Sequence, residues 1–174
     1  MEIHRYEKLW FGLALLLIVG FIATITYGAV GAGVQMVNDD GGTVDPADIE
    51  DREEFADWPE PQAQHVEGDE YEVAVQAVQF NFLPGGSQPI EVRENSKVTF
   101  YITTPDVIHG FDIVGTNVNT MVIPGQMTEI TVEFGEYDER TTKGILCNEF
   151  CGAGHEDMAG EITIVPEEEW EGDQ

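Results

Sequence analysis

The stretch KVTFYITT, residues 97–104, is the clearest sign of the fold of this 174-residue chain. It is dominated by β-branched and aromatic residues, which suit the pleated surface of a β-strand. Pro105 follows at once and interrupts the pattern. We therefore expect a strand over residues 97–104.

Short stretches of the same kind lie on both sides of this strand. Tyr71–Gln79 alternates, with valine at positions 73, 75 and 78 among polar or small neighbours. Further strands are expected at His109–Val114, Asn117–Ile123, Met127–Phe134, Lys143–Cys147 and Glu161–Val165. Glycine and proline separate them, at Pro105, Gly115, Pro124-Gly125, Gly135 and Gly152. Six or seven short strands at this spacing predict an all-β fold, an antiparallel sandwich or a small barrel.

The N-terminal part has a different character, because no charged residue occurs from Leu9 to Val37. As a helix this segment would span roughly 43 Å, against a hydrocarbon core of about 30 Å. The alternative is a cleaved signal peptide, but its apolar region is normally only about 7–15 residues long, so we expect a single retained transmembrane helix. Arg5 and Lys8 precede the span and acids follow it, which favours an inner N-terminus and an outer soluble domain.

The chain is accordingly divided into four parts. Residues 1–37 form the membrane anchor, 38–67 an acidic linker, 68–166 the β-domain and 167–174 an acidic tail. The linker is rich in glycine, proline and acids and has little apolar periodicity. We expect the tail to be disordered.

Charge excludes one class of function. The chain has 34 acidic and 7 basic residues, a formal net charge of -27, and residues 1–38 contribute none of it because two bases balance two acids there. A body this acidic repels phosphate, so nucleic-acid binding is excluded. Two interpretations remain: a solvated surface suited to very high salt, as in a halophilic protein, or a docking face for a basic redox partner. The even spread of the acids favours the first.

The segment CNEFCGAGHEDM, residues 147–158, carries the chemistry. Its spacing C-x3-C-x3-H-x2-M brings together Cys147, Cys151, His155 and Met158. Thiolate and thioether sulfur are soft ligands that select copper, and imidazole suits copper as well; zinc would gain little from the thioether. The segment lies between two expected strands, so its donors share one end loop. A disulfide between the two cysteines is the alternative.

Two histidines lie outside this loop and the N-terminus. His65 is in the linker, where we expect it to be solvated. His109 follows Pro105 at the start of an expected strand and can face the same end loop. Such a histidine alone is more often structural, but next to a Cys–Cys–His–Met loop we expect it to be a fifth metal donor.

These segments resemble a known family. The loop at 147–158 fits the pattern C-x-[EQ]-x-C-G-x-x-H-x-x-M of subunit II of the haem–copper terminal oxidases, the cytochrome c oxidase family. The stretch TPDVIHGFDIVGTNVN, residues 104–119, most resembles the B-type branch, whose subunit II has one transmembrane helix. The resemblance covers nearly the whole chain, and its motif is highly specific.

The resemblance implies a cupredoxin-like Greek-key sandwich with a two-copper centre called CuA. Cys147 and Cys151 would each bridge both copper ions. His109 and Met158 would complete one ion, and His155 and the backbone carbonyl of Glu149 the other. In this family the two ions share one unpaired electron, so bond lengths change little on reduction.

Three further roles, for four residues, follow from the resemblance. Phe80 and Phe82 align with an aromatic stretch near the surface where electrons enter, with core packing as the alternative. Glu149 occupies a position at which the A-type branch uses a carboxylate for magnesium at the contact with subunit I; since the other features are B-type, magnesium binding stays open. Glu7 resembles a carboxylate at the mouth of a B-type proton channel, with an ordinary interfacial charge as the alternative.

The implied function is electron relay in the cell membrane. An external donor, cytochrome c or a small blue copper protein, would reduce CuA, and the electrons would pass to haem in subunit I, where oxygen becomes water. Three other copper proteins fit less well. A thioredoxin-like copper chaperone needs a βαβ pattern, a one-copper blue protein uses a single cysteine, and the CuA domain of a nitrous-oxide-reducing enzyme comes fused to a propeller.

Overall fold

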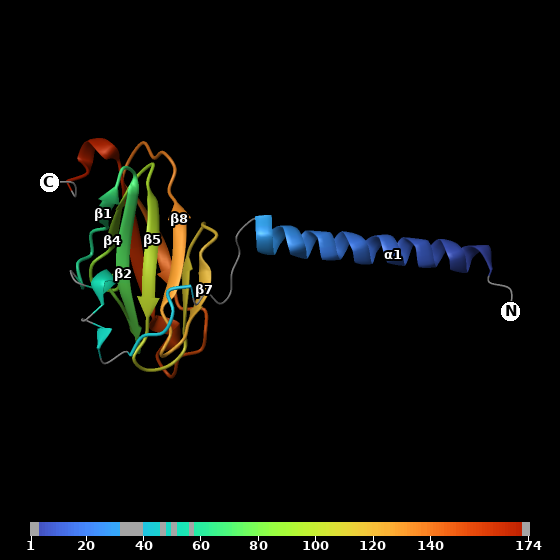
Figure 1. The fold of residues 1–174 in the computed structure, drawn as a ribbon, viewed down its shortest axis with the longest axis horizontal. Coiled ribbons are helices and arrows are strands. Elements are labelled where there is room, and N and C mark those ends of the chain that lie inside the picture. Colours follow the sequence, from blue (N-terminus) through green and yellow to red (C-terminus); the bar gives the residue numbers. More distant parts are fainter. Residues whose placement is uncertain (1–3, 32–39, 46–47, 50–51, 56–57, 172–174) are drawn as a thin grey trace. The chain divides into compact units, whose positions relative to one another are not determined.

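The computed structural model describes residues 4–31, 40–45, 48–49, 52–55 and 58–171. They fall into two compact units, residues 1–34 and 35–174. The first is an apolar helix and the second a two-sheet sandwich (Figure 1). This confirms the predicted fold class, an all-β cupredoxin-like domain preceded by one apolar helix.

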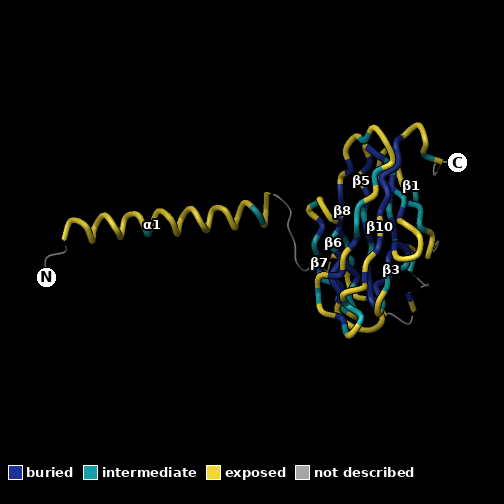
Figure 2. Tube along the Cα trace, turned by 180° about the vertical axis from the view of Figure 1, so that it is seen from behind, coloured by how far each residue is buried: buried dark blue, intermediate teal, exposed yellow. Residues whose placement is uncertain are grey.

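Helix α1 spans Arg5–Thr26 and continues as a π-helical turn over Tyr27–Gly31. It begins with a capping box: the His4 N–H donates to Glu7 Oε2 at 2.9 Å, and the Tyr6 N–H donates to His4 Nδ1 at 3.4 Å. None of its residues is buried within the protein (Figure 2). The helical run Arg5–Gly31 is long and apolar enough to cross a membrane.

The sandwich consists of two five-stranded sheets. The first has the order β1 (Gln64–Glu67), β2 (Glu70–Val78), β5 (Lys97–Thr103) and β8 (Thr128–Glu133), and β3 (Asn81–Leu83) also pairs with β2. The second has the order β4 (Ile90–Arg93), β10 (Ala159–Val165), β9 (Thr141–Leu146), β6 (His109–Ile113) and β7 (Asn119–Val122). Figure 1 shows the long strands β2, β5 and β8 side by side.

The sandwich is not antiparallel throughout, which differs from the antiparallel pairing that we expected. Strand β2 pairs with β5 in parallel, and β10 pairs with β4 in parallel; the other pairs are antiparallel. The reason lies in the path of the chain. After β3 it adds β4 to the second sheet and then returns to the first, so that β5 lies beside β2 and runs in the same direction.

Side chains that alternate along the strands fill the space between the sheets. On β5, Val98, Phe100 and Ile102 are fully buried, as the pattern of KVTFYITT requires. The Phe111 ring of β6 packs between Phe82, at a centroid distance of 5.6 Å, and Phe100, at 5.8 Å. This core gives the end loops a rigid base.

Part of the predicted linker packs on the sandwich. Val44, Ile49 and Phe55 form a small buried cluster with Met127. The backbone joins in, because the Met127 N–H donates to the Gly42 carbonyl at 2.8 Å. These apolar residues are too widely spaced to show a period, so the sequence pattern concealed this docking.

The first residues of the acidic tail are also ordered, contrary to our expectation. A 3-10 turn covers Glu167–Glu169, which is η5, and the Trp170 ring meets Tyr71 edge-on at 5.7 Å. Arg93 Nη2 lies 2.5 Å from Glu167 Oε1. Two contacts therefore hold this segment: the ring contact of Trp170 with Tyr71 and the ion pair of the largely buried Arg93 with Glu167.

Candidate metal centre

Five predicted donor side chains meet at one end of the sandwich. His109 is the first residue of β6, Cys147 follows β9 directly, and Cys151, His155 and Met158 lie in the loop that leads into β10. Within that loop a 3-10 turn, His155–Asp157, aims the histidine back toward the cysteines. Strand β6 and the loop between β9 and β10 therefore supply the whole set.

The distances between donor atoms define a compact cluster. The two cysteine Sγ atoms are 3.8 Å apart, and both thiols are free. Cys147 Sγ lies 3.9 Å from His109 Nδ1 and 3.2 Å from the Glu149 carbonyl oxygen. A disulfide bond is about 2.05 Å long, so the cysteines are not joined.

The second cysteine has its own pair of neighbours. Cys151 Sγ lies 3.5 Å from His155 Nδ1 and 3.7 Å from Met158 Sδ. His109, both cysteines and Met158 are buried, and His155 is half-buried at the rim. Each sulfur is therefore flanked by one imidazole nitrogen and one further donor, in a largely dry environment.

A carboxylate fixes the orientation of His109. His109 Nε2 lies 2.8 Å from Asp106 Oδ1, which leaves Nδ1 to face the cysteines. Asp106 also accepts hydrogen bonds from the N–H groups of Gln79, at 2.7 Å, and Val107, at 2.6 Å. Burial raises the pKa of Asp106, but these hydrogen bonds outweigh it and hold the pKa below its usual value.

The environment of Cys151 bears on metal binding. Burial, together with the neighbouring Cys147 thiol, raises the pKa of Cys151 to about 11. This thiol is therefore protonated at neutral pH in the metal-free protein. Because a metal binds the thiolate, binding must release this proton, and apparent affinity increases with pH.

The backbone around Cys147 is equally constrained. The Gly110 N–H points at Cys147 Sγ, with the nitrogen 3.5 Å away. A side chain at Gly110 would place Cβ 1.8 Å from Asn148 Oδ1, so only glycine admits the loop here. Asn148 in turn donates from Nδ2 to Asn119 Oδ1 at 2.7 Å and ties the loop to β7.

The predicted residues outside the donor set lie in different environments. Phe82 is fully buried in the core, as the packing alternative had it, whereas Phe80 is 38 % exposed and its ring lies against the cysteine loop. Glu7 caps α1. His65 is exposed, with Nε2 3.0 Å from the Gly68 carbonyl oxygen.

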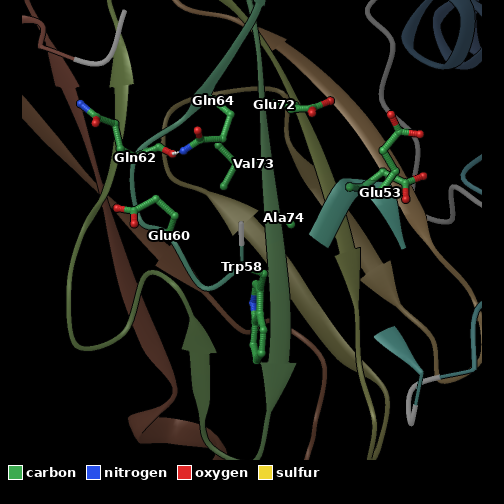
Figure 3. A pocket seen from close by; sticks show the side chains of 9 residues that line it. Glu53, Trp58, Glu60, Gln62, Gln64, Glu72, Val73 and Ala74 are labelled. Carbon is green, nitrogen blue, oxygen red and sulfur yellow. Dashed lines mark hydrogen bonds between the residues drawn. The ribbon is translucent and has the colours of Figure 1, made fainter. Parts of the chain in front are cut away.

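A separate pocket lies on the outer face of β2 (Figure 3). Trp58, Glu60, Gln64 and Glu72 line it, together with Val73 and Ala74. Burial, followed by the charges of Glu54 and Glu53, raises the pKa of Glu72. Neither thiol nor imidazole lines this pocket, so it does not extend the metal centre.

The donor set fits copper better than a hard cation. The two thiols and the thioether are soft ligands and the two imidazoles are borderline, whereas the backbone carbonyl is the one hard oxygen donor. Within the described residues, His109, Cys147 and Cys151 form the group of His, Cys and acidic residues whose ligand atoms lie close enough to hold a metal ion, all within 4.8 Å of one another. Sequence reasoning named the five side chains that the structure brings together but missed Asp106 and Gln79, although the spacing D-x2-H in PDVIH was a usable signal for Asp106.

A β-sandwich with a sulfur-rich cluster at one end that could hold a metal defines a protein of the cupredoxin-like class. Comparison with known proteins places the chain within that class. Residues 55–165 match the family described as cytochrome c oxidase subunit II, periplasmic domain. The chain belongs to the cytochrome c oxidase subunit II family.

Individual relatives agree with this assignment. The chain is 36 % identical to a cytochrome c oxidase subunit 2 of Thermus thermophilus, over 93 % of both chains. A cryo-EM structure of a haem–copper terminal oxidase dimer contains a chain 29 % identical to this one, with a TM-score of 0.65 and coverage of 92 % and 99 %. The periplasmic domain of subunit II from Bradyrhizobium japonicum, 20 % identical over 60 % of this chain and 91 % of its own, has a TM-score of 0.52 and shares the fold.

The family resemblance predicted from the sequence is therefore confirmed. Subunit II of a haem–copper oxidase works together with subunit I. The apolar N-terminal helix and the periplasmic domain of the family support a membrane-anchored chain with an outer domain.

Proposed function

We propose that this chain relays electrons through a two-copper CuA centre, from an external donor to haem in subunit I, where oxygen is reduced to water. One observation carries the proposal: two free thiols 3.8 Å apart, each flanked by an imidazole nitrogen and one further donor. A one-copper blue centre needs a single thiolate and would leave the second cysteine without a role.

The ligands divide between two metal positions. Cys147 and Cys151 would bridge both ions, His109 and Met158 would hold one, and His155 with the Glu149 carbonyl would hold the other. Copper held there would supply the one-electron redox chemistry. The protein keeps the donors in place through Asp106 and the sheet, and it excludes water by burying both sulfurs.

The surface around the centre suits an electron donor that docks at this end. Phe150 is 77 % exposed beside the ligands, and Phe80, Val107 and Ile108 are exposed as well. The neighbouring acids Glu156 and Asp157 favour a donor with a basic rim around an apolar centre. Cytochrome c and a small blue copper protein are the two candidates, and reduction kinetics with each purified donor at two salt concentrations distinguish them.

Three finer roles belong to the same proposal. Phe80, which covers the loop at the surface, is the better candidate of the aromatic pair for receiving electrons. The half-buried Glu149 is the candidate magnesium ligand at the contact with subunit I, and Glu7 is the candidate at the proton-channel mouth. The dispersed acids suit a single-pass membrane protein whose outer domain works in high salt.

The test uses the full chain, purified in detergent and loaded with copper. We expect two copper ions per chain, an intense purple colour and an electron paramagnetic resonance spectrum in which one unpaired electron couples to both nuclei. A colourless protein, or a blue protein with one copper, would contradict the proposal. Copurification of a haem- and copper-bearing large subunit would support the partner assignment.

A further inference from the structure

We propose that Gln79 is a positioning residue that joins the two ligand-bearing segments of the metal centre. The inference rests on the proposed function and deepens it. Gln79 follows the last residue of β2 and belongs to neither ligand segment. Its side chain contacts one segment and its backbone contacts the other.

Two hydrogen bonds define the link. The side-chain amide, Nε2 of Gln79, donates to the carbonyl oxygen of Cys151. The backbone N–H of the same residue donates to Asp106 Oδ2 at 2.7 Å, and the other oxygen of that carboxylate holds His109 Nε2 at 2.8 Å. A continuous path therefore runs from the His109 imidazole to the Cys151 backbone through a single glutamine.

The cysteine loop approaches this turn as closely as glycine permits. A Cβ on Gly152 would lie 2.8 Å from Gln79 Nε2, and one on Gly154 would lie 2.7 Å from a Phe80 ring carbon. Gly152 also has a φ of +136°, which other residues rarely adopt. The Gln79–Phe80 turn thus packs directly on the Cys151–Gly154 backbone.

The link matters because the cysteine loop is otherwise tied to the sheet mainly through the hydrogen bond from Asn148 to β7. Its backbone bonds are local: the His155 N–H donates to the Gly152 carbonyl at 3.1 Å, and the Cys147 N–H lies 3.4 Å from the Met158 carbonyl. Strand β2, in contrast, is paired with both β3 and β5 near its C-terminal end. Gln79 therefore transmits the rigidity of the sheet to Cys151 and sets its position relative to His109.

The experiment removes the side-chain amide of Gln79, which donates to Cys151, and leaves its backbone N–H, which donates to Asp106, in place. Gln79→Met keeps the length of the side chain without the amide, and Gln79→Glu puts a carboxylate opposite the Cys151 carbonyl. Gln64→Met is the matched control, because Gln64 Nε2 also donates to a backbone carbonyl, that of Gln62, at 2.8 Å. Gln64 belongs to β1, a strand that carries no metal ligand. Gln79 is exposed, so neither change disturbs the core.

Copper-loaded full chains are compared by the rate of copper release to a chelator, by visible spectrum and by reduction potential. Loss of one net hydrogen bond predicts release about fivefold faster in Gln79→Met, with a shifted spectrum and potential. Copper release should be faster still in Gln79→Glu, since the new carboxylate and the Cys151 carbonyl are both acceptors and repel each other. Gln64→Met should release copper at the rate of the parent chain. An unchanged Gln79→Met, with the parent chain holding two copper ions, would overturn the inference and leave the proposed function intact.

The metal-free chain gives an independent readout. A Cys151 that is no longer held by Gln79 should be alkylated about fivefold faster in Gln79→Met, at equal thermal stability of the sandwich. Alkylation can be measured even if the parent chain does not form the two-copper centre. Failure to form that centre would contradict the proposed function and would leave the role of Gln79 to be decided by the alkylation rates. Equal alkylation rates in Gln79→Met and the parent chain would overturn the role of Gln79.

Discussion

The two ends of the sandwich differ in how they use charge. At the end opposite the metal centre, Arg93, Lys97 and Arg140 all form ion pairs with acids, among them Arg93 Nη1–Asp69 Oδ1 at 3.0 Å. The segments that build the metal end contain neither lysine nor arginine, namely residues 79–89, 104–110, 123–127 and 147–158. They instead present exposed apolar side chains such as Phe150 and Ile108.

The difference separates stabilisation from recognition. Ion pairs lie where no ligand is held, and they tie the tail and the strand ends together. At the metal end the carboxylate of Asp106 is hydrogen-bonded to His109 instead of to a lysine or arginine. Changes at the metal end should therefore alter the proposed copper centre strongly, whereas changes at the far end should alter only stability, and weakly.

The largest effect is expected for Cys147→Ser. Cys147 Sγ contacts His109, the Glu149 carbonyl and the Cys151 sulfur, so its loss removes the shared donor of the cluster. A serine hydroxyl is a hard, protonated ligand at neutral pH and cannot bridge two copper ions. Copper content and the visible spectrum should both show the two-copper centre abolished. A purple two-copper Cys147→Ser protein would disprove the bridging assignment.

A smaller effect at the same end is expected for Asp106→Ala. The change removes the partner of His109 Nε2 and the acceptor of the Gln79 N–H. We expect copper release to accelerate about tenfold and the metal-free sandwich to lose about 1–2 kcal/mol of unfolding free energy. Glu156→Ala, an exposed acid at this end, is the control, and equal release rates in the two variants would contradict the role of Asp106.

The metal end also shows which links a sequence can predict. The donors Cys147, Cys151, His155 and Met158 lie within twelve residues, and His109 follows a visible strand break, so local pattern was sufficient to find them. The bond from Gln79 to Cys151 joins residues 72 positions apart and depends on how β2 ends beside the loop. No local pattern encodes such a contact, which is why the five clustered side chains were predicted and Gln79 was not.

The same limit explains the errors in the fold. Strands with strong alternation, such as β5 and β8, were found close to their observed bounds. Strands β1, β3 and β4 are only three or four residues long and were missed, and β1 lies within the predicted linker. The parallel pairing of β2 with β5 depends on the crossing through β4, so without β4 there was no basis for predicting it.

At the far end, Glu94→Gln should lower stability without changing the copper spectrum. Glu94 accepts from the N–H groups of Tyr137 and Glu167, each at 2.8 Å, and these hydrogen bonds lower its pKa in the folded state. A lowered folded pKa contributes stability above the unfolded value, about 4.3, and loses it as pH falls through the folded value. Thermal unfolding should therefore show the variant less stable at pH 7 and the difference shrinking below about pH 4.

The smallest effect is expected for Lys97→Met. Its ammonium is paired with Glu70 at 2.9 Å, and both side chains are about half exposed, so solvent and salt screen the attraction. In a chain of net charge -27, removal of a base also increases self-repulsion. Unfolding midpoints should thus differ slightly from the parent at low salt and coincide at about 1 M salt. At high salt an external electron donor should reduce the variant and the parent chain at the same rate, because Lys97 begins β5 at the end remote from the ligands. A copper centre altered by this change would mean that the two ends are not independent.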